Sequence, residues 1–177
     1  MNALEINNLT KKFPGFCLDS ISLTLPSGCI MGLIGENGAG KSTTIRLILD
    51  ILHKDGGTVT ILGKDNEDNI SLTKEEVGVV FDETGLPDCF TTQKTGEVMS
   101  RIYRAWDEEK YEEILRRFSL PSDKKFKDFS RGMKMKLGIA IAMSHGSRLL
   151  LLDEPTGGLD PVVREDFLDM LMDFTRD

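Results

Sequence analysis

The segment of residues 35–42, with the sequence GENGAGKS, restricts the possible folds of this chain more than any other feature. It matches the pattern G-x-x-x-x-G-K-[ST], in which the backbone N–H groups of a glycine-rich loop surround phosphate oxygens. A mostly apolar run at 29–34 precedes the loop, and apolar residues recur at helical spacing from Ile45 to Leu52 after it. The sequence therefore predicts a strand, a phosphate-binding loop and a helix in succession, which is typical of an α/β fold.

The residues of this loop have different expected roles. Gly38 and Gly40 let the backbone turn tightly around phosphate, and the helix that begins near Lys41 adds the positive end of its dipole. Lys41 is expected to bind the β and γ phosphates, Ser42 to ligate Mg²⁺ through its hydroxyl, and Thr43 to donate from its backbone. The alternative is a glycine-rich turn that is followed by Lys-Ser by chance, and the strand and helix around it argue against that.

Two acidic residues follow a run of four leucines. Asp153 and Glu154 come directly after residues 149–152, which we interpret as a central parallel strand, and directly before Pro155. Ligands of open α/β sheets bind at the carboxyl ends of such strands. We expect Asp153 to hold Mg²⁺, mostly through water, and Glu154 to orient or deprotonate an attacking water. An isolated acidic pair is more often a helix cap or a solvated turn, but the phosphate loop elsewhere in the chain favours the functional interpretation.

A second anion-binding geometry is predicted at Ser130. This residue precedes the helical sequence KMKLGIAIAMS and is a natural N-cap, so the amides that follow it lie at a positive helix end. Lys134 and Lys136 add positive charge. We infer that this segment serves a second molecule, because the helical region before it separates it from Lys41. The alternative is a capped amphipathic helix with a basic flank.

The other elements follow from apolar periodicity. Residues 1–30 alternate as half-buried antiparallel strands, 58–62 and 77–81 are expected to be strands, and 91–144 three helices in which Val98 and Ile102 belong to the apolar face. A helix is expected from Pro161, behind a capping Asp160.

Composition narrows the range of ligands and locations. Lys and Arg number 22 against 29 Asp and Glu, which gives a net charge of −7, so we expect no nucleic-acid ligand.

Three cysteines, Cys17, Cys29 and Cys89, fit neither a disulfide framework nor a metal site; we expect reduced thiols in a cytosolic protein, with Cys29 in the core. Both histidines, His53 and His145, are expected at the surface. The sequence has no leader-like start and no 18-residue apolar run, which argues against export or a membrane span.

Taken together, residues 35–42, 130–133 and 149–155 resemble, in this order, the motifs of the nucleotide-binding subunit of ATP-binding cassette (ABC) transporters. The form SRGMKMK is most similar to ABC-2-type export systems of bacteria. The resemblance implies a P-loop NTPase with a RecA-like parallel core, an antiparallel β-subdomain and a helical subdomain at about 84–146. It implies one domain over residues 1–177 that is incomplete at its C-terminus.

The same resemblance implies what the chain does and with which partners. It implies ATP and Mg²⁺ as ligands, ATP hydrolysis that powers transport, and a head-to-tail dimer with a second nucleotide-binding subunit. It also implies integral membrane subunits, which would hold the chain at the cytoplasmic face of the cell membrane. Competing hypotheses are a soluble ABC ATPase of translation or DNA repair and a nucleotide-dependent regulatory module without hydrolysis. A small-molecule P-loop kinase is disfavoured, because it would need an arginine-rich lid.

Individual residues acquire roles by this resemblance. Lys41 and Glu154 are the expected catalytic residues, and Asp153 is the Walker B aspartate. Phe13 is similar to the aromatic residue that stacks on adenine, although a phenylalanine between strands is core at least as often. Residues 158–160 resemble the D-loop. The residues expected to bind nucleotide are Phe13, Gly35, Asn37, Gly38, Ala39, Gly40, Lys41, Ser42, Thr43, Ser130 and Gly132, the last two in the signature motif.

Three positions depart from the family pattern. Asp82 stands where the family usually has a glutamine, and its carboxylate is expected to reach Mg²⁺ through water. Arg131 replaces the first glycine of the common signature. The family's switch histidine lies beyond the segment that here ends at Asp177. We therefore expect a chain with exposed apolar surface that binds nucleotide and hydrolyses it weakly.

Overall fold

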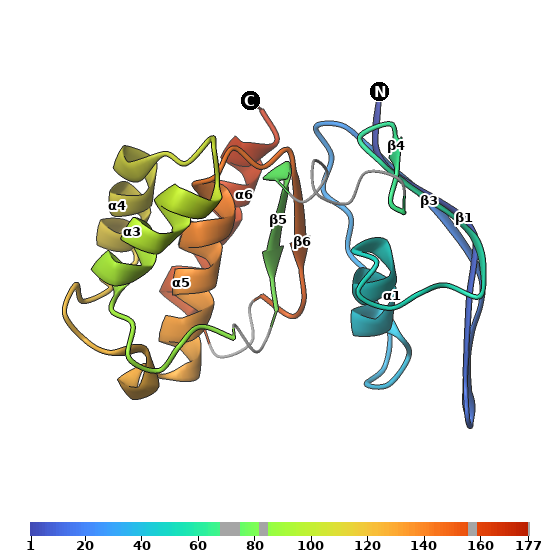
Figure 1. Ribbon diagram of the computed structural model, residues 1–177, viewed down its shortest axis with the longest axis horizontal. Coiled ribbons are helices and arrows are strands. Elements are labelled where there is room, and N and C mark those ends of the chain that lie inside the picture. The colour runs from blue at the N-terminus through green and yellow to red at the C-terminus, as the bar shows by residue number, and fades with distance from the viewer. Residues whose placement is uncertain (68–74, 82–84, 156–158, 177) are drawn as a thin grey trace. The chain divides into compact units, whose positions relative to one another are not determined.

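The computed structural model describes residues 1–67, 75–81, 85–155 and 159–176 (Figure 1). The chain divides into two compact units. The first consists of residues 1–74 together with 171–177, and the second of residues 75–170.

The first unit is built on an antiparallel sheet, as the alternating sequence predicts. Its strands are β1 (Asn2–Phe13), β2 (Phe16–Pro26), β3 (Gly56–Ile61) and β4 (Lys64–Asp65), in the order β2-β1-β3-β4. Leu4, Ile6 and Leu9 of β1 and Val59 and Ile61 of β3 are buried, since one face of the sheet is apolar. The expected antiparallel strands are confirmed.

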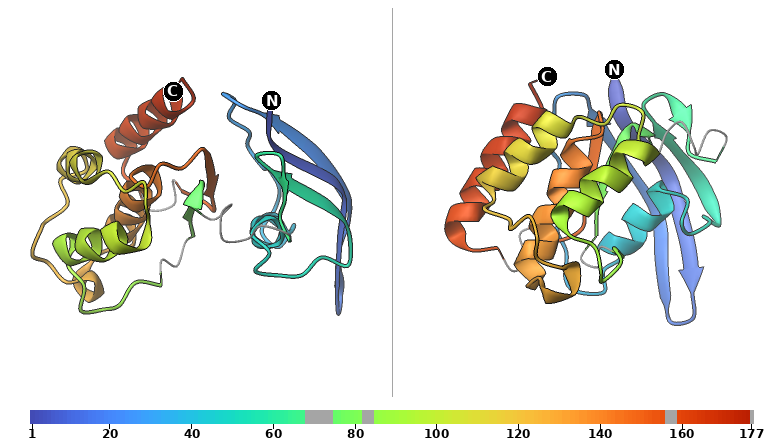
Figure 2. Two further views of the ribbon diagram at one scale, coloured as in Figure 1. Left: turned by 45° about the horizontal axis from the view of Figure 1, so that its top comes forward. Right: turned by 60° about the vertical axis from the view of Figure 1, so that its left-hand side comes forward.

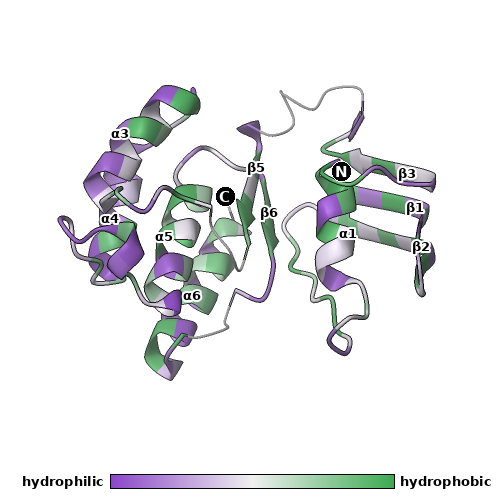
Figure 3. Ribbon diagram, turned by 60° about the horizontal axis from the view of Figure 1, so that its bottom comes forward, coloured by the Kyte–Doolittle hydropathy of each residue, from purple (hydrophilic) through white to green (hydrophobic). Residues whose placement is uncertain are grey.

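Helix α1 (Lys41–Ile48) lies on one face of this sheet (Figures 1 and 3). Ile45, Leu47 and Ile48 are buried, which satisfies the helical spacing seen in the sequence. The helix is shorter than the apolar pattern, because the backbone leaves the helical region at Leu49 and Asp50 has a left-handed φ of 50°.

The strand predicted at 29–34 is not formed. This segment is irregular in the structure, and Cys29 and Ile34 are exposed, Ile34 with 98% of its surface. The physical reason is that a strand needs a paired neighbour, and the sheet of this unit has β2 and β4 at its edges, with no pairing to 29–34. An apolar run signals burial, but it does not specify the partner. The expectation of a buried Cys29 is therefore wrong, whereas exposed apolar side chains are present as expected.

The second unit contains the parallel pair β5 (Val77–Val80) and β6 (Leu149–Leu152), in register from Val77 opposite Leu149 to Val80 opposite Leu152. The predicted strands at 77–81 and 149–152 are confirmed. Gly78 is needed for packing, since a Cβ at this position would lie 2.6 Å from the carbonyl oxygen of Ala142.

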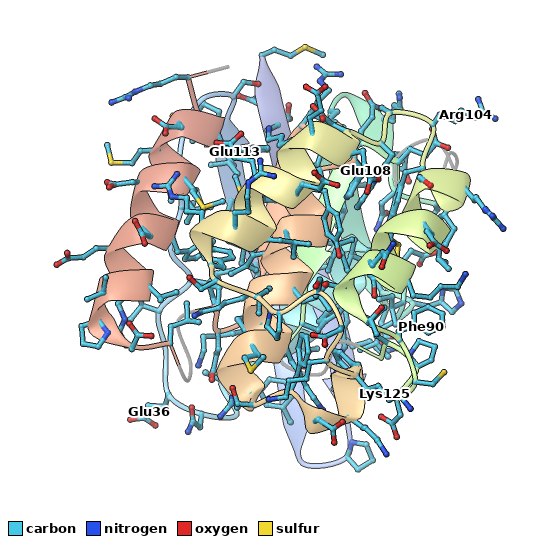
Figure 4. The ribbon with its side chains drawn as sticks, turned by 90° about the vertical axis from the view of Figure 1, so that its left-hand side faces the viewer. Glu36, Phe90, Arg104, Glu108, Glu113 and Lys125 are labelled. Carbon is cyan, nitrogen blue, oxygen red and sulfur yellow. The ribbon has the colours of Figure 1, made fainter. Side chains whose placement is uncertain are left out.

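The predicted helical subdomain consists of α3 (Thr92–Ile102), α4 (Glu108–Arg117), the short 3₁₀ helix η1 (Phe126–Asp128) and α5 (Arg131–Met143). Figure 2 shows α3, α4 and α5 side by side. Phe90 and Lys125 lie at the same end of this subdomain (Figure 4), where the Phe126 N–H donates to the Phe90 carbonyl oxygen at 2.7 Å. The expectation of three helices is confirmed.

The buried face of α3 differs from the prediction. Ile102 is 58% exposed, and the buried residues are Thr92, Thr95 and Gly96. Tyr111 of α4 explains why this face of α3 is buried, because its hydroxyl donates to the Thr92 carbonyl oxygen at 2.9 Å. A Cβ on Gly96 would lie 2.9 Å from the Tyr111 ring. Close approach of the two helices therefore decides the buried face.

Helix α6 (Pro161–Phe174) begins as predicted, with Asp160 Oδ1 accepting from the Val163 N–H at 3.0 Å. Phe167 and Met170 are its buried residues. Within the described stretches, no helix has both the length and the apolar content that crossing a membrane requires. All three cysteines are free thiols, as expected.

His145 is buried, contrary to expectation. Only 2% of its surface is exposed, its ring stacks on Tyr103 at 4.1 Å, and its Nδ1 lies 3.1 Å from the Glu75 carbonyl oxygen. Gly146, with φ 72°, turns the chain here. Desolvation lowers the pKa of His145 from 6.5, although the hydrogen bond to Glu75 opposes this effect. The side chain of His53 is 85% exposed, as expected.

Candidate functional site

The phosphate loop is closed by its own lysine. Lys41 Nζ donates to the Gly35 carbonyl oxygen at 2.8 Å and to the Glu36 carbonyl oxygen at 3.0 Å. The Ala39 N–H also donates to Glu36, at 3.1 Å, while the Glu36 side chain points away from the loop (Figure 4). Asn37 is exposed between these contacts. The ammonium group therefore lies against the loop backbone, where a bound anion would add to its contacts.

The glycines of the loop have backbone conformations that other residues avoid. Gly38 has φ 86° and Gly40 has φ 97°. A Cβ on Gly38 would meet nothing within 4 Å, whereas a Cβ on Gly40 would lie 2.9 Å from Leu18 Cδ1 and 3.0 Å from Phe16 Cζ. Gly40 is thus fixed by both conformation and space, and Phe16 and Leu18 are supporting residues that the sequence did not reveal.

Donors of α1 are directed beyond its N-terminus. Its first helical hydrogen bond runs from the Thr44 N–H to the Gly40 carbonyl oxygen at 2.8 Å, and the Thr44 hydroxyl donates to the same oxygen at 2.9 Å. Helical geometry directs the N–H groups of Lys41 and Thr43 away from the helix body. The Ser42 hydroxyl belongs to the same first turn. This arrangement suits the binding of a polyanion.

Phe13 lies at the end of the β1–β2 hairpin. It is 36% exposed, its ring is 6.1 Å from that of Phe16, and Lys11 Nζ lies 5.9 Å from its centroid. The ring is thus partly supported and partly open. Its role in adenine stacking stays a prediction.

In the second unit, Asp153 and Glu154 follow β6 directly. The Asp153 N–H donates to the Val80 carbonyl oxygen at 2.9 Å, which extends the β5–β6 pairing by one residue. Asp153 is buried, with 8% of its surface exposed, whereas Glu154 is exposed and has a left-handed φ of 50°. A left-handed φ is strained for glutamate, because its Cβ crowds the backbone there. Asp82, the third predicted magnesium ligand, and Gly158 of the predicted D-loop lie outside the described residues.

Ser130 is the N-cap of α5. Its hydroxyl accepts from the Met133 N–H at 3.2 Å, and Gly132 lies in the first turn. The nearby lysines have partners in the same unit, since Lys134 Nζ lies 4.7 Å from the Phe126 ring centroid and Lys136 Nζ lies 3.4 Å from the Phe118 carbonyl oxygen. The N-terminal end of α5 has the dipole orientation that favours an anion, and both lysines have contacts within their own unit.

The residue types suit magnesium bound together with phosphate. In the part of the chain that the structure describes, no three His, Cys, Asp or Glu side chains are grouped as a metal site. Mg²⁺ commonly uses only one or two carboxylates and completes its shell with water and substrate phosphates. The Ser42 hydroxyl of the first unit and the Asp153 carboxylate of the second are each a type of ligand that Mg²⁺ accepts.

A family model described as ABC transporter matches residues 18–157. The chain belongs to the ABC transporter family. The ABC transporter ATP-binding protein YtrB of Bacillus subtilis is 33% identical over 171 residues, which cover 96% of this chain and 58% of that protein. The bacitracin transport ATP-binding protein BcrA of Enterococcus faecalis is 35% identical over 90% of this chain and 53% of that protein. The ABC chain therefore spans somewhat more than half the length of these relatives.

Solved structures agree with the family assignment. The ATP-binding subunit of an ABC transporter superposes with a TM-score of 0.88 and 27% identity, over 98% of this chain and 75% of that one. A dimeric ATP-binding cassette in a post-hydrolysis state with ADP and Pi gives a TM-score of 0.81 at 25% identity, over 95% and 81% of the two chains. The predicted P-loop NTPase fold is thereby confirmed.

Proposed function

We propose that this ABC chain binds and hydrolyses MgATP and so powers transport through separate integral membrane subunits. The observation that carries the proposal is the loop of residues 35–43, in which Lys41 lies against the Gly35 and Glu36 carbonyl oxygens at the N-terminus of α1. Backbone N–H groups and a positive charge lie together there, which supports the binding of a polyphosphate.

Each candidate residue has a distinct proposed role. Lys41 and the loop amides bind the triphosphate, and Ser42 and Asp153 hold Mg²⁺, with Asp82 acting through water. When bound, Mg²⁺ neutralises charge on the phosphates. Glu154 orients the attacking water and accepts its proton. The exposure of Glu154 and the burial of Asp153 support this division, because only Glu154 is open to solvent.

The dimer and the direction of transport are also proposals. We propose a head-to-tail pair in which Ser130 and Gly132 of one copy contact the nucleotide on the other. The dimeric post-hydrolysis cassette supports pairing. Relatives that are named for bacitracin transport, daunorubicin/doxorubicin resistance and Nod factor export support an export function at the inner face of the membrane.

Nucleotide titration tests the central proposal. We expect calorimetry to show saturable binding of MgATP and far weaker binding of AMP, because the loop recognises the β and γ phosphates. Phosphate release from MgATP would then measure turnover. Equal affinity for AMP and ATP, or the absence of any binding, would overturn the assignment of the loop.

A further inference from the structure

Asn66 lies beyond β4 and reaches the far end of the helix that carries the phosphate loop. It is 3% exposed, and its Nδ2 donates to the Leu47 carbonyl oxygen at 2.9 Å and to the Ile48 carbonyl oxygen at 3.1 Å. Its own N–H donates to the Val59 carbonyl oxygen at 3.0 Å, which fastens it to β3. The side chain thus joins the C-terminus of α1 to the sheet.

This contact completes the hydrogen bonding of the last turn. The final four carbonyl groups of a helix receive no hydrogen bond from an N–H group of the same helix, so they need other donors. The Ile45 oxygen accepts from the Leu49 N–H at 3.1 Å, and the Arg46 oxygen from the Ile51 N–H at 2.9 Å. The Leu47 oxygen accepts from the Asp50 N–H at 3.2 Å and from Asn66 as a second donor, whereas the Ile48 oxygen accepts from Asn66. A buried carbonyl without a donor would cost stability and loosen the turn.

A buried lysine fixes the orientation of the Asn66 amide. Lys54 Nζ donates to Asn66 Oδ1 at 3.1 Å and pairs with Glu67 Oε1 at 2.6 Å. The Lys54 side chain is only 8% exposed. Because an ammonium group can only donate, Oδ1 must face it and Nδ2 must face the helix. The three residues therefore form one connected support, which we call the α1 clamp: Lys54, Asn66 and Glu67.

The opposite end of α1 rests on the same sheet. Phe16 and Leu18 of β2 occupy the space beside Gly40, the N-cap of the helix. The helix has 8 residues, so its two ends are about 12 Å apart. A short, rigid helix that is held at both ends transmits a shift at one end to the other.

We infer that Asn66 is a positioning residue for the phosphate loop and acts through α1. The inference rests on the proposed ATP function for its consequence in binding, but its structural part concerns this unit alone. Without the amide donor, the C-terminus of α1 detaches from β3 and β4, and the first turn, with Lys41 and Ser42, loses its fixed place.

The decisive variant is Asn66→Asp. It keeps the shape but replaces the donor by an oxygen that faces two carbonyl oxygens and the negative helix end. We expect the Kd for MgATP to rise about tenfold. Hydrogen exchange of the Thr44 amide, which donates the first helical hydrogen bond of α1 to Gly40, should become faster in the ligand-free protein. Lys54→Met, which removes the support of Oδ1, should change both quantities in the same direction by a smaller factor, and it carries the test if Asn66→Asp does not fold.

Asn2→Asp is the matched control. Asn2 Nδ2 also makes a side-chain hydrogen bond on this sheet, to Glu5 Oε1 at 3.0 Å, and this partner belongs to β1 rather than to α1. This variant should keep the wild-type Kd and exchange rates. A lower Tm for Asn66→Asp with unchanged Kd and unchanged exchange of the Thr44 amide would reduce Asn66 to a purely structural residue and overturn the inference. If the wild type does not bind ATP, the proposed function fails, and exchange in the ligand-free variants still decides the role of Asn66.

Discussion

Lys41 Nζ and the carbonyl oxygen of Gly35 are 2.8 Å apart, although the two residues are separated by six positions along the chain. The residue that we propose binds phosphate therefore also closes the loop that surrounds it. Removing the ammonium group should affect both tasks at once.

Lys41→Ala should lose ATP binding, with Kd raised at least about 100-fold, because a charge-assisted contact and the loop closure disappear together. Calorimetry measures this change. Lys110→Ala, on α4, removes a lysine from the other unit and should leave the affinity unchanged. Tight binding by Lys41→Ala would refute its assignment.

Gly40→Ala should lower the free energy of unfolding by about 2 kcal/mol or more, since the new Cβ meets Phe16 and Leu18 and the left-handed backbone is strained. Gly38→Ala is the control, because it carries the strain of φ 86° without the collision. It should cost about 1 kcal/mol. Urea unfolding compares the two, and equal costs would contradict the packing argument.

Glu154→Gln should bind MgATP with the wild-type Kd but release phosphate at least about 100-fold more slowly, because the amide cannot accept the proton of water. The ATP-bound dimer should accumulate and be visible by light scattering. An unchanged rate of phosphate release would remove Glu154 from this role.

Ser130→Ala, made together with Glu154→Gln, should prevent the dimer from accumulating. Thr91→Ala is its control, since Thr91 caps α3 just as Ser130 caps α5. Each variant should lose about 1 kcal/mol of stability with its cap. Only the loss of Ser130 should abolish ATP-dependent pairing, and pairing that survives in Ser130→Ala would limit this residue to capping.

Acid should destabilise the second unit through His145. Because burial lowers the pKa of His145 below 6.5 in the folded protein, the unfolded chain binds this proton more readily. The free energy of unfolding should thus fall as the pH drops through about 6.5, and the loss should continue until the folded histidine is protonated. His145→Gln should reduce this slope in urea unfolding between about pH 7.5 and about pH 5.5.

Local signals in the sequence predicted the elements that depend on neighbouring residues. The phosphate loop, the caps at Ser130 and Asp160, and the parallel strand before Asp153 follow from short-range chemistry. The prediction of a strand at 29–34 was wrong, because strand pairing depends on partners that are distant in the sequence.

Packing between helices and loops accounts for the remaining differences. His145 and the buried face of α3 are set by contacts with Tyr103 and Tyr111, and the periodicity of one helix does not specify which neighbour its residues meet. The sequence did not predict the role of Asn66, because an asparagine after a short strand is typical of an ordinary turn. The contact that distinguishes it is made to carbonyl groups 18 and 19 positions earlier.

The left-handed backbone of Glu154 is strained at the position that we propose orients the attacking water. Glycine or asparagine would adopt a φ of 50° with less strain than glutamate does. A library screened only for heat resistance should therefore enrich these residues at 154, and the survivors would lack the carboxylate. We therefore expect thermostable variants selected in this way to hydrolyse ATP more slowly than the wild type.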